Sequence, residues 1–161
     1  MTIENIYQKV ITGNIYDFEV ASAHNCKMYQ QQTRAKDLPE IEARFISENH
    51  KGCCLHYGMA LIHLLHEAGY RVYLTVTPEE DGGNHCSVLY FIGDEYYIAD
   101  PVEDVIHGTT NQHMAIKYDT FVANAIRHEI KHVDIYGKCG DELFFTQTFL
   151  KDNALNLADL I

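Results

Sequence analysis

The stretch that decides the fold is residues 52–76, GCCLHYGMALIHLLHEAGYRVYLTV. Apolar side chains are too dense between residues 53 and 68 for a helix with one narrow apolar stripe, so this segment predicts a mostly buried helix. Gly52 stands where the N-cap is expected, and Gly69 supplies a left-handed stop. Residues 71–77, RVYLTVT, are rich in β-branched and aromatic side chains and predict a strand directly after the helix.

Two further strands are predicted at residues 85–92 and 95–99, and the Gly93-Asp94 pair between them is typical of a two-residue hairpin turn. More elements are expected on either side. Helices are predicted over residues 14–32, over residues 38–46 and from a cap at Asp119 to residue 126. Strands are predicted over residues 133–136 and 142–149. The strands follow one another without crossover helices. This order predicts the α+β class, with a helix leading into an antiparallel sheet.

Composition restricts the classes of function. The 161 residues show no repeat and no linker-like segment, so a single domain over residues 1–161 is expected. Lys and Arg number 12 against 23 Asp and Glu, and the net charge of −11 makes nucleic acid and anionic membranes poor partners. No apolar run approaches the roughly 20 residues that span a bilayer. The start, MTIENIYQK, has no export pattern, so a cytoplasmic location is expected.

The five cysteines are an odd number, and in a reducing compartment one of them can serve as a reactive thiol. Cys54 lies in the first turn of the predicted buried helix. Unpaired backbone N–H groups and the positive end of the helix dipole favour a thiolate there. The same N–H groups could stabilise an oxyanion that forms on an attacked carbonyl. A nucleophile at Cys54 then needs a base and a group that orients the base.

The hairpin offers that pair. If Gly93 and Asp94 form the turn, counting back along the two strands places Ser87 opposite Asp100. His85 lies two residues before Ser87 and therefore shares its face of the sheet. Asp100 is then a diagonal neighbour of His85 on the same face, about 7–8 Å away before the side chains reach toward each other. An imidazole and a carboxylate can span that distance.

Residues 47–105 resemble the transglutaminase-like branch of the papain-like cysteine enzymes. The resemblance lies in Gly52-Cys53-Cys54 at the helix start, the strand opening NHCSVLY and the strand end YYIADP. It implies a papain-like core, in which the cysteine-bearing helix packs on an antiparallel sheet, with N-terminal helices. It also implies Cys54 as nucleophile, His85 as base and Asp100 as orienting carboxylate.

The reaction that this resemblance implies is hydrolysis, deamidation or acyl transfer at a carboxamide or peptide carbonyl through a thioester, without a metal or other cofactor. The expected partner is a peptide or protein substrate. The acceptor, water or an amine, stays open, as does the oligomeric state. A second oxyanion donor is also open between Asn49 and the Gln30-Gln31-Gln32 run.

Three alternatives stand beside this interpretation. Cys53 is the rival nucleophile, because one helical step turns the side chain by about 100° and only one of Cys53 and Cys54 can face His85. The chain could also keep the fold as a catalytically inactive binding domain. The third alternative is a zinc-dependent hydrolase, because residues 128–132, HEIKH, fit the H-E-x-x-H pattern through His128, Glu129 and His132. The strand expected from residue 133 disfavours a helix there.

Overall fold

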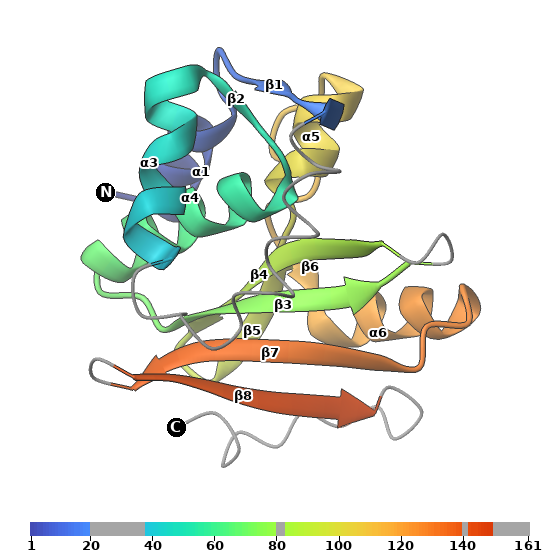
Figure 1. The fold of residues 1–161 in the computed structure, drawn as a ribbon. Helices are drawn as coiled ribbons and strands as arrows, with labels where there is room; N and C mark the ends of the chain where they lie inside the picture. Colours follow the sequence, from blue (N-terminus) through green and yellow to red (C-terminus); the bar gives the residue numbers. More distant parts are fainter. Residues whose placement is uncertain (20–37, 80–82, 140–141, 150–161) are drawn as a thin grey trace.

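The computed structural model describes residues 1–19, 38–79, 83–139 and 142–149 (Figure 1). The helices are α1 (Ile3–Ile11), α3 (Leu38–Asn49), α4 (Cys54–Glu67), α5 (Pro101–His107) and α6 (Tyr118–Arg127). The strands are β1 (Ile15–Tyr16), β2 (Lys51–Gly52), β3 (Val72–Pro78), β4 (Asn84–Ile92), β5 (Glu95–Ala99), β6 (Ile116–Lys117), β7 (His132–Cys139) and β8 (Glu142–Phe149).

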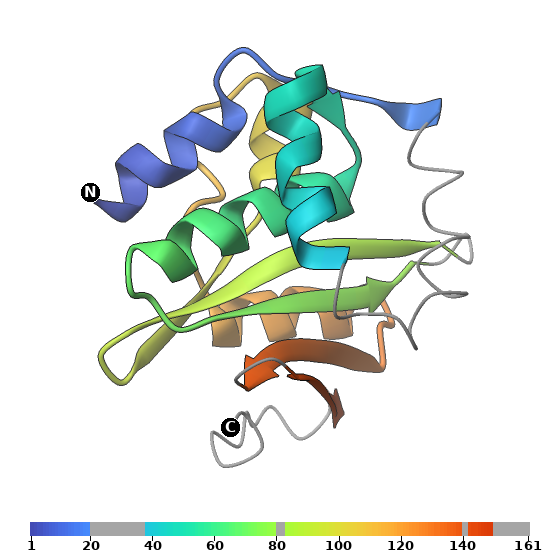
Figure 2. The same cartoon turned by 60° about the vertical axis from the view of Figure 1, so that its left-hand side comes forward.

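One antiparallel sheet of six strands, in the order β6-β5-β4-β3-β7-β8, forms the centre of the fold. Helices α1, α3, α4 and α5 gather on one side of it, and α6 covers the other side (Figures 1 and 2). The predicted α+β class is confirmed, with the cysteine-bearing helix packed on an antiparallel sheet and helices preceding it. Within the described residues, no helix has both the length and the apolar character that crossing a membrane requires.

The alternation of side chains along the strands creates two apolar cores. On β4, Cys86, Val88 and Tyr90 belong to the larger core beneath α1 and α4, whereas Leu89 and Phe91 belong to the smaller core that α6 covers. Successive strand residues point to opposite faces, so a strand with both faces covered is apolar at almost every position. This explains why β4 reads as a continuous apolar run rather than as an alternating one.

The hairpin register matches the prediction from the turn. Gly93 adopts a φ of 62°, which suits a tight turn, and the strands on either side are paired from Ile92 opposite Glu95 to Val88 opposite Ala99. The register continues in the direction that brings Asp100 level with the start of β4. The face on which each hairpin side chain lies is therefore fixed by this turn.

The N-terminal prediction needs correction. The first helix is α1, which begins after the Thr2 cap and ends before Gly13 at a φ of 76°. The helix expected from Asn14 does not begin there, because the following two residues form β1 and pair in parallel with β2. Residues 18 and 19 are helical, and the rest of that predicted helix lies outside the described residues.

Other boundaries shift by a few residues. Helix α3 continues to Asn49, three residues beyond its predicted end. Cys53 rather than Gly52 is the N-cap of α4, while Gly69 has the expected positive φ of 89°. Asp119 is not the cap of α6, because the helix begins one residue earlier with Lys117 at the N-cap. Strand β7 is longer than predicted and pairs with β3, a contact between segments far apart in sequence.

Candidate active site

Cys54 is the first residue of α4, and strand β2 leads directly into this helix. The N-cap, Cys53, has extended backbone geometry. A Cβ atom at Gly52 would lie 2.7 Å from Ile46 Cδ1 and 2.8 Å from the Cβ atom of His56, so only glycine fits this close approach. The chain therefore enters the helix along a fixed path, and this fixes where Cys54 lies.

His85 and Asp100 come from the two strands of the hairpin. His85 is the second residue of β4, and Asp100 directly follows β5 at the N-cap of α5. His85 Nε2 lies 2.5 Å from Asp100 Oδ2, which leaves Nδ1 of the ring for another partner. The ring interacts with the thiol of Cys54, whose Sγ atom lies 4.0 Å from the carbonyl oxygen of Asn84. The structure thus brings together the three side chains that the sequence singled out.

The electrostatics of His85 favour its protonated form. Burial alone would lower the pKa of His85, but the charge of Asp100 and the hydrogen bond to it outweigh burial and raise this pKa well above the ordinary value. The contact with Cys54 raises it further. An imidazole in this setting holds a proton firmly, as a group that accepts one from a thiol must.

The thiol of Cys54 behaves differently from the sequence expectation. Its hydrogen bond with Cys53 lowers the pKa of Cys54, but a hydrogen bond with Cys86 and burial raise it, and the net pKa lies above the ordinary value. The helix N-terminus acts only over the first turn. Cys54 is 2% exposed, and removal from water disfavours the charged form. The contact with His85 also lowers this pKa but does not outweigh Cys86 and burial, so the neutral thiol is favoured in this arrangement.

Cys53 lies in a separate environment. Its Sγ atom is 3.4 Å from Nδ1 of His56, and the same nitrogen accepts a hydrogen bond from the Cys53 backbone at 3.0 Å. The hydrogen bond with Cys54 and burial raise the pKa of Cys53 to about 12. His56 is fully buried and stacks on Phe45 with ring centroids 3.8 Å apart. Of the two adjacent thiols, Cys54 and not Cys53 meets His85.

Tyr16 is a residue that sequence reasoning misses. It pairs with Gly52 in the short parallel ladder, and its hydroxyl oxygen accepts a hydrogen bond from the Cys54 backbone. Burial and then the charges of Cys54 and Cys53 raise the pKa of Tyr16, so the hydroxyl keeps its proton as a donor. A strand of two residues has no periodicity that would reveal it in the sequence.

Of the two candidates that the sequence offered for a second oxyanion donor, only Asn49 lies among the described residues. Asn49 is exposed, and its side-chain amide donates 2.9 Å to the carbonyl oxygen of Phe45 within α3. It is therefore turned onto its own helix. The Gln30-Gln31-Gln32 run lies outside the described residues.

A buried carboxylate on α5 supports the position of Asp100. The hydroxyl of Tyr7 lies 2.5 Å from Asp104 Oδ2 and 3.1 Å from the carbonyl oxygen of Asp100. Asp104 also accepts hydrogen bonds from the Thr109 hydroxyl and the His113 backbone. Burial opposes its charge, but these hydrogen bonds prevail and lower the pKa of Asp104. This network ties α1 and the loop after α5 to the residue that holds His85.

The H-E-x-x-H pattern does not form a helical zinc motif. Helix α6 ends at Arg127, and His128 is its C-cap. Glu129 has a φ of 61°, and His132 begins β7. Two imidazoles meet on one side of a metal only when the four-residue spacing lies on a continuous helix. The local structure therefore removes the basis of the zinc-hydrolase alternative.

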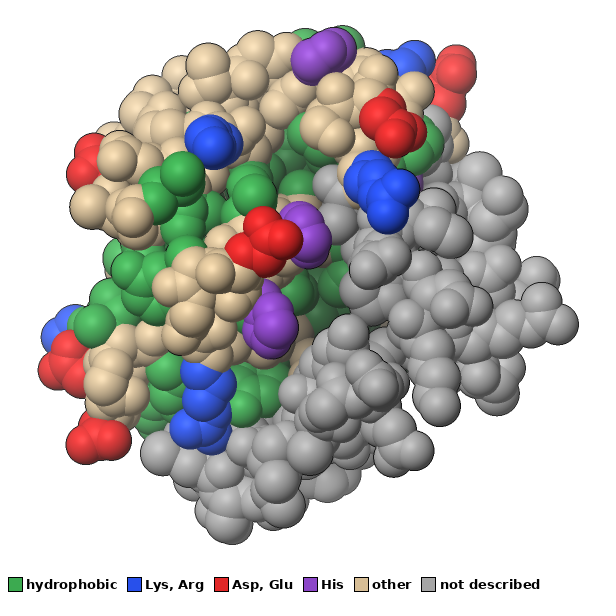
Figure 3. All heavy atoms as spheres, turned by 90° about the vertical axis from the view of Figure 1, so that its left-hand side faces the viewer, with side chains coloured by type: hydrophobic (Ala, Val, Ile, Leu, Met, Phe, Trp, Pro, Cys, Tyr) green, Lys and Arg blue, Asp and Glu red, His purple; other side chains and the backbone are tan. Residues whose placement is uncertain are grey.

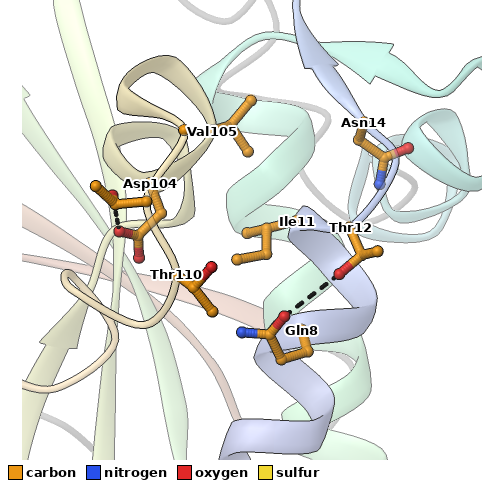
Figure 4. Close-up of a pocket in the computed structure, with 9 residues that line it drawn as sticks. Gln8, Ile11, Thr12, Asn14, Asp104, Val105 and Thr110 are labelled. Carbon is orange, nitrogen blue, oxygen red and sulfur yellow. Dashed lines mark hydrogen bonds between the residues drawn. The ribbon is translucent and has the colours of Figure 1, made fainter.

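A small pocket lies between α1 and α5 and contains none of the three site residues. Figure 4 shows Gln8 on α1 and Thr12 at its C-cap facing Val105 and Thr110 across it. On the face drawn in Figure 3, acidic, basic and histidine side chains are interspersed. No basic patch gathers among the described residues of that face, in keeping with the acidic composition.

Solved structures that are similar to this chain include a TGase and a putative cysteine protease from Cytophaga hutchinsonii. The TGase has 17% sequence identity and a TM-score of 0.45, over 62% of this chain and 25% of that chain. The Cytophaga protein has 13% identity and a TM-score of 0.43, over 92% of this chain and 44% of that chain. The chain thus spans less than half the length of either structure. Its sequence matches no family model and no curated protein.

Proposed function

We propose that this chain is a thiol-dependent hydrolase or acyltransferase of the transglutaminase-like type, built as one domain. Cys54 is the nucleophile, His85 the base and Asp100 the residue that orients the imidazole. The observation that carries the proposal is the 2.5 Å contact between His85 Nε2 and Asp100 Oδ2, together with the interaction of the same imidazole with the Cys54 thiol. Such a chain of thiol, imidazole and carboxylate is the arrangement that activates a cysteine.

The reaction would proceed in two halves. The reactive form carries a neutral His85, whose raised pKa makes it a strong proton acceptor. The Cys54 proton passes to this imidazole as Sγ bonds to the carbonyl carbon of a carboxamide or peptide. The amine then leaves with that proton and a thioester remains. In the second half, His85 takes a proton from water or from an acceptor amine, the new nucleophile attacks the thioester and Sγ is released with its proton restored. Asp100 stays ionised and stabilises the imidazolium between these steps.

The developing oxyanion would be held at the start of α4. The Cys54 backbone N–H belongs to the first turn, where such groups have no partner within the helix. The Tyr16 hydroxyl accepts a hydrogen bond from that same N–H and keeps its own proton, so an oxyanion that displaced Tyr16 from the N–H would lie next to the hydroxyl. Two donors aimed where charge develops lower the barrier more than donors that bind the substrate alone. Tyr16 is accordingly proposed as the second donor.

The expected substrate is a peptide or protein that carries the carboxamide. The chain's net charge of −11 favours neutral or basic segments over acidic ones. Nucleic acids and membranes are not expected partners.

A matched pair of cysteine variants tests the nucleophile. Cys54→Ala should abolish release of ammonia or amine from a glutamine-containing peptide library, and Cys53→Ala should retain turnover. Both thiols are buried neighbours on the same helix start, so the comparison separates reactivity from packing. Retained turnover in the Cys54 variant and loss in the Cys53 variant would reassign the nucleophile.

A catalytically inactive binding domain is the second candidate, and the raised pKa of Cys54 is the observation that favours it. The rate of iodoacetamide alkylation at Cys54, followed by mass spectrometry between pH 5 and 10, separates the two. A thiolate–imidazolium pair reacts well below the ordinary cysteine pKa of about 8.5, whereas a neutral buried thiol reacts only above it. Alkylation confined to high pH would support the binding domain.

A further inference from the structure

A group of three side chains at the start of α5 has the composition of a metal site. One ligand atom each from His85, Asp100 and Glu103 lies within 4.8 Å of the other two. Asp100 precedes the helix and Glu103 is its third residue, so both carboxylates project from the same end of α5. The side chains are 22%, 10% and 40% exposed, in the order His85, Asp100, Glu103. An ion could therefore reach the group from the Glu103 side.

A second observation concerns the oxygen of Asp100 that does not contact His85. Asp100 is 7% exposed, and its Oδ1 atom is buried with no hydrogen-bond partner among the described residues. A buried carboxylate oxygen without a donor is costly and rare in folded proteins. A cation bound beside it would supply the missing partner. The orphaned oxygen thus points to a ligand and not only to an acidic cluster.

The donor set favours one class of ion. An imidazole nitrogen with two carboxylate oxygens suits zinc and other first-row divalent transition metals, whereas magnesium and calcium prefer oxygen alone. Tetrahedral zinc with ligands at about 2.0–2.2 Å separates neighbouring ligand atoms by roughly 3.3–3.6 Å. To bind it, the 2.5 Å contact between His85 and Asp100 would have to open by about 1 Å, and the wider separations within the group would have to close.

Glu103 is also held by a neighbour. His107 Nε2 lies 3.0 Å from Glu103 Oε2, one helical turn further along α5. Partners of this kind orient a ligating carboxylate and tune its affinity for the metal. The N-terminus of α5 carries the positive end of the helix dipole, which repels a cation weakly because the helix has only seven residues. The negative charge of the two carboxylates outweighs this repulsion.

We propose that His85, Asp100 and Glu103 bind a divalent first-row transition ion such as Zn²⁺, and that this ion and the thiol chemistry exclude each other. The exclusion rests on the proposed function. The ion would bind His85 Nε2 in place of the contact with Asp100, and a metal-bound His85 could no longer accept the proton of Cys54. Metal binding itself needs no catalytic activity. The site would make the enzyme responsive to free zinc.

Cobalt titration tests the site directly, because Co²⁺ occupies zinc sites and absorbs visible light. The intact chain should bind one Co²⁺, which Zn²⁺ displaces. Glu103→Gln removes a direct ligand and should weaken binding by at least the ~10–100-fold that loss of an outer-shell partner costs. Glu67→Gln is the matched control, because Glu67 forms a comparable exposed pair with His63, also four residues apart, on α4. This variant should bind as the wild type does. Absence of binding, or equal affinity in Glu103→Gln, would overturn the site.

The Cys54→Ala variant separates this proposal from the proposed function. This variant should bind Co²⁺ with the affinity of the wild type. Neither the wild type nor Cys54→Ala should show a sulfur-to-cobalt charge-transfer band. Loss of binding in Cys54→Ala would place the ion on the thiol and overturn the assignment. Zinc should also slow alkylation of Cys54 in the wild type and not in Glu103→Gln. Bound zinc with an unchanged alkylation rate would overturn the exclusion while the binding site stands.

Discussion

Replacing Gly52 by alanine should destabilise the protein, because the new methyl group has no room. Its Cβ atom would stand 2.7 Å from Ile46 Cδ1 and 2.8–2.9 Å from Cβ and Nδ1 of His56. Ordinary contacts between such atoms begin near 3.4 Å. The Ile46 methyl group can rotate away, but His56 cannot, since it is fully buried and stacks on Phe45 at 3.8 Å. The backbone between β2 and α4 must therefore move.

The expected magnitude follows from this geometry. Forcing one extra methyl into a well-packed interior costs about 1–3 kcal/mol, and here two of the three close contacts are to the immobile side chain of His56, at its Cβ atom and at Nδ1. A loss of about 2 kcal/mol in the free energy of unfolding corresponds to a fall in Tm of about 4–8 °C for a chain of this length. Because Cys54 follows two residues later, the rate of its alkylation should change as well.

Urea unfolding followed by circular dichroism measures this loss, and Gly58→Ala is the matched control. At Gly58, inside α4, an added Cβ atom meets Leu74 Cδ1 at 3.2 Å and Val88 Cγ2 at 4.0 Å, both flexible side-chain ends. Alanine also favours a helix interior over glycine by about 1 kcal/mol, so this change should alter stability by less than about 1 kcal/mol. Equal stability of the two variants would refute the packing argument for Gly52.

Three further outcomes are expected. Tyr7→Phe removes the hydroxyl that contacts Asp104 and should lower the free energy of unfolding by about 1–3 kcal/mol in urea titration, because a buried carboxylate loses a donor. Because the pKa of His85 is raised in the folded state, its protonated form stabilises the fold. This stabilisation is fully present below pH ~6.5 and is lost as pH rises through the folded-state pKa. The free energy of unfolding of Asp100→Asn, measured across this pH range, should not show that decline. Tyr16→Phe should reduce kcat about 10²–10³-fold with little change in KM, as expected for a donor to the oxyanion, and unchanged kinetics would exclude that role.

The hairpin and the pair on it were accessible from sequence because their geometry is local. A two-residue turn at Gly93-Asp94 sets the register, and every later position follows by counting. That reasoning reaches as far as Asp100, which lies one residue beyond β5. The buried helix was equally accessible, since its apolar density and the Gly69 stop are both local signals.

The features that escaped prediction depend on contacts between distant segments. The β1–β2 ladder joins residues 36 positions apart through two residue pairs, as in Ile15 opposite Lys51, and nothing local marks it. Helix α5 left a signal that could have been used, because Pro101 at the first position and Gly108 after the last are typical of a helix start and stop. The pKa of Cys54 required knowing that Cys86 and the core surround it.

The adjacent thiols of Cys53 and Cys54 show how tertiary structure gives neighbouring residues of the same type different environments. Both Cys53 and Cys54 stand at the start of α4, so helix-dipole arguments treat them almost alike. The change from extended to helical backbone between them turns Cys53 inward to His56 and leaves Cys54 facing the hairpin. Which sulfur meets an imidazole is therefore set by where the hairpin packs, and the hairpin's place depends on the core beneath α4. The environment of each sulfur is therefore a property of the packed fold rather than of the cysteine motif alone.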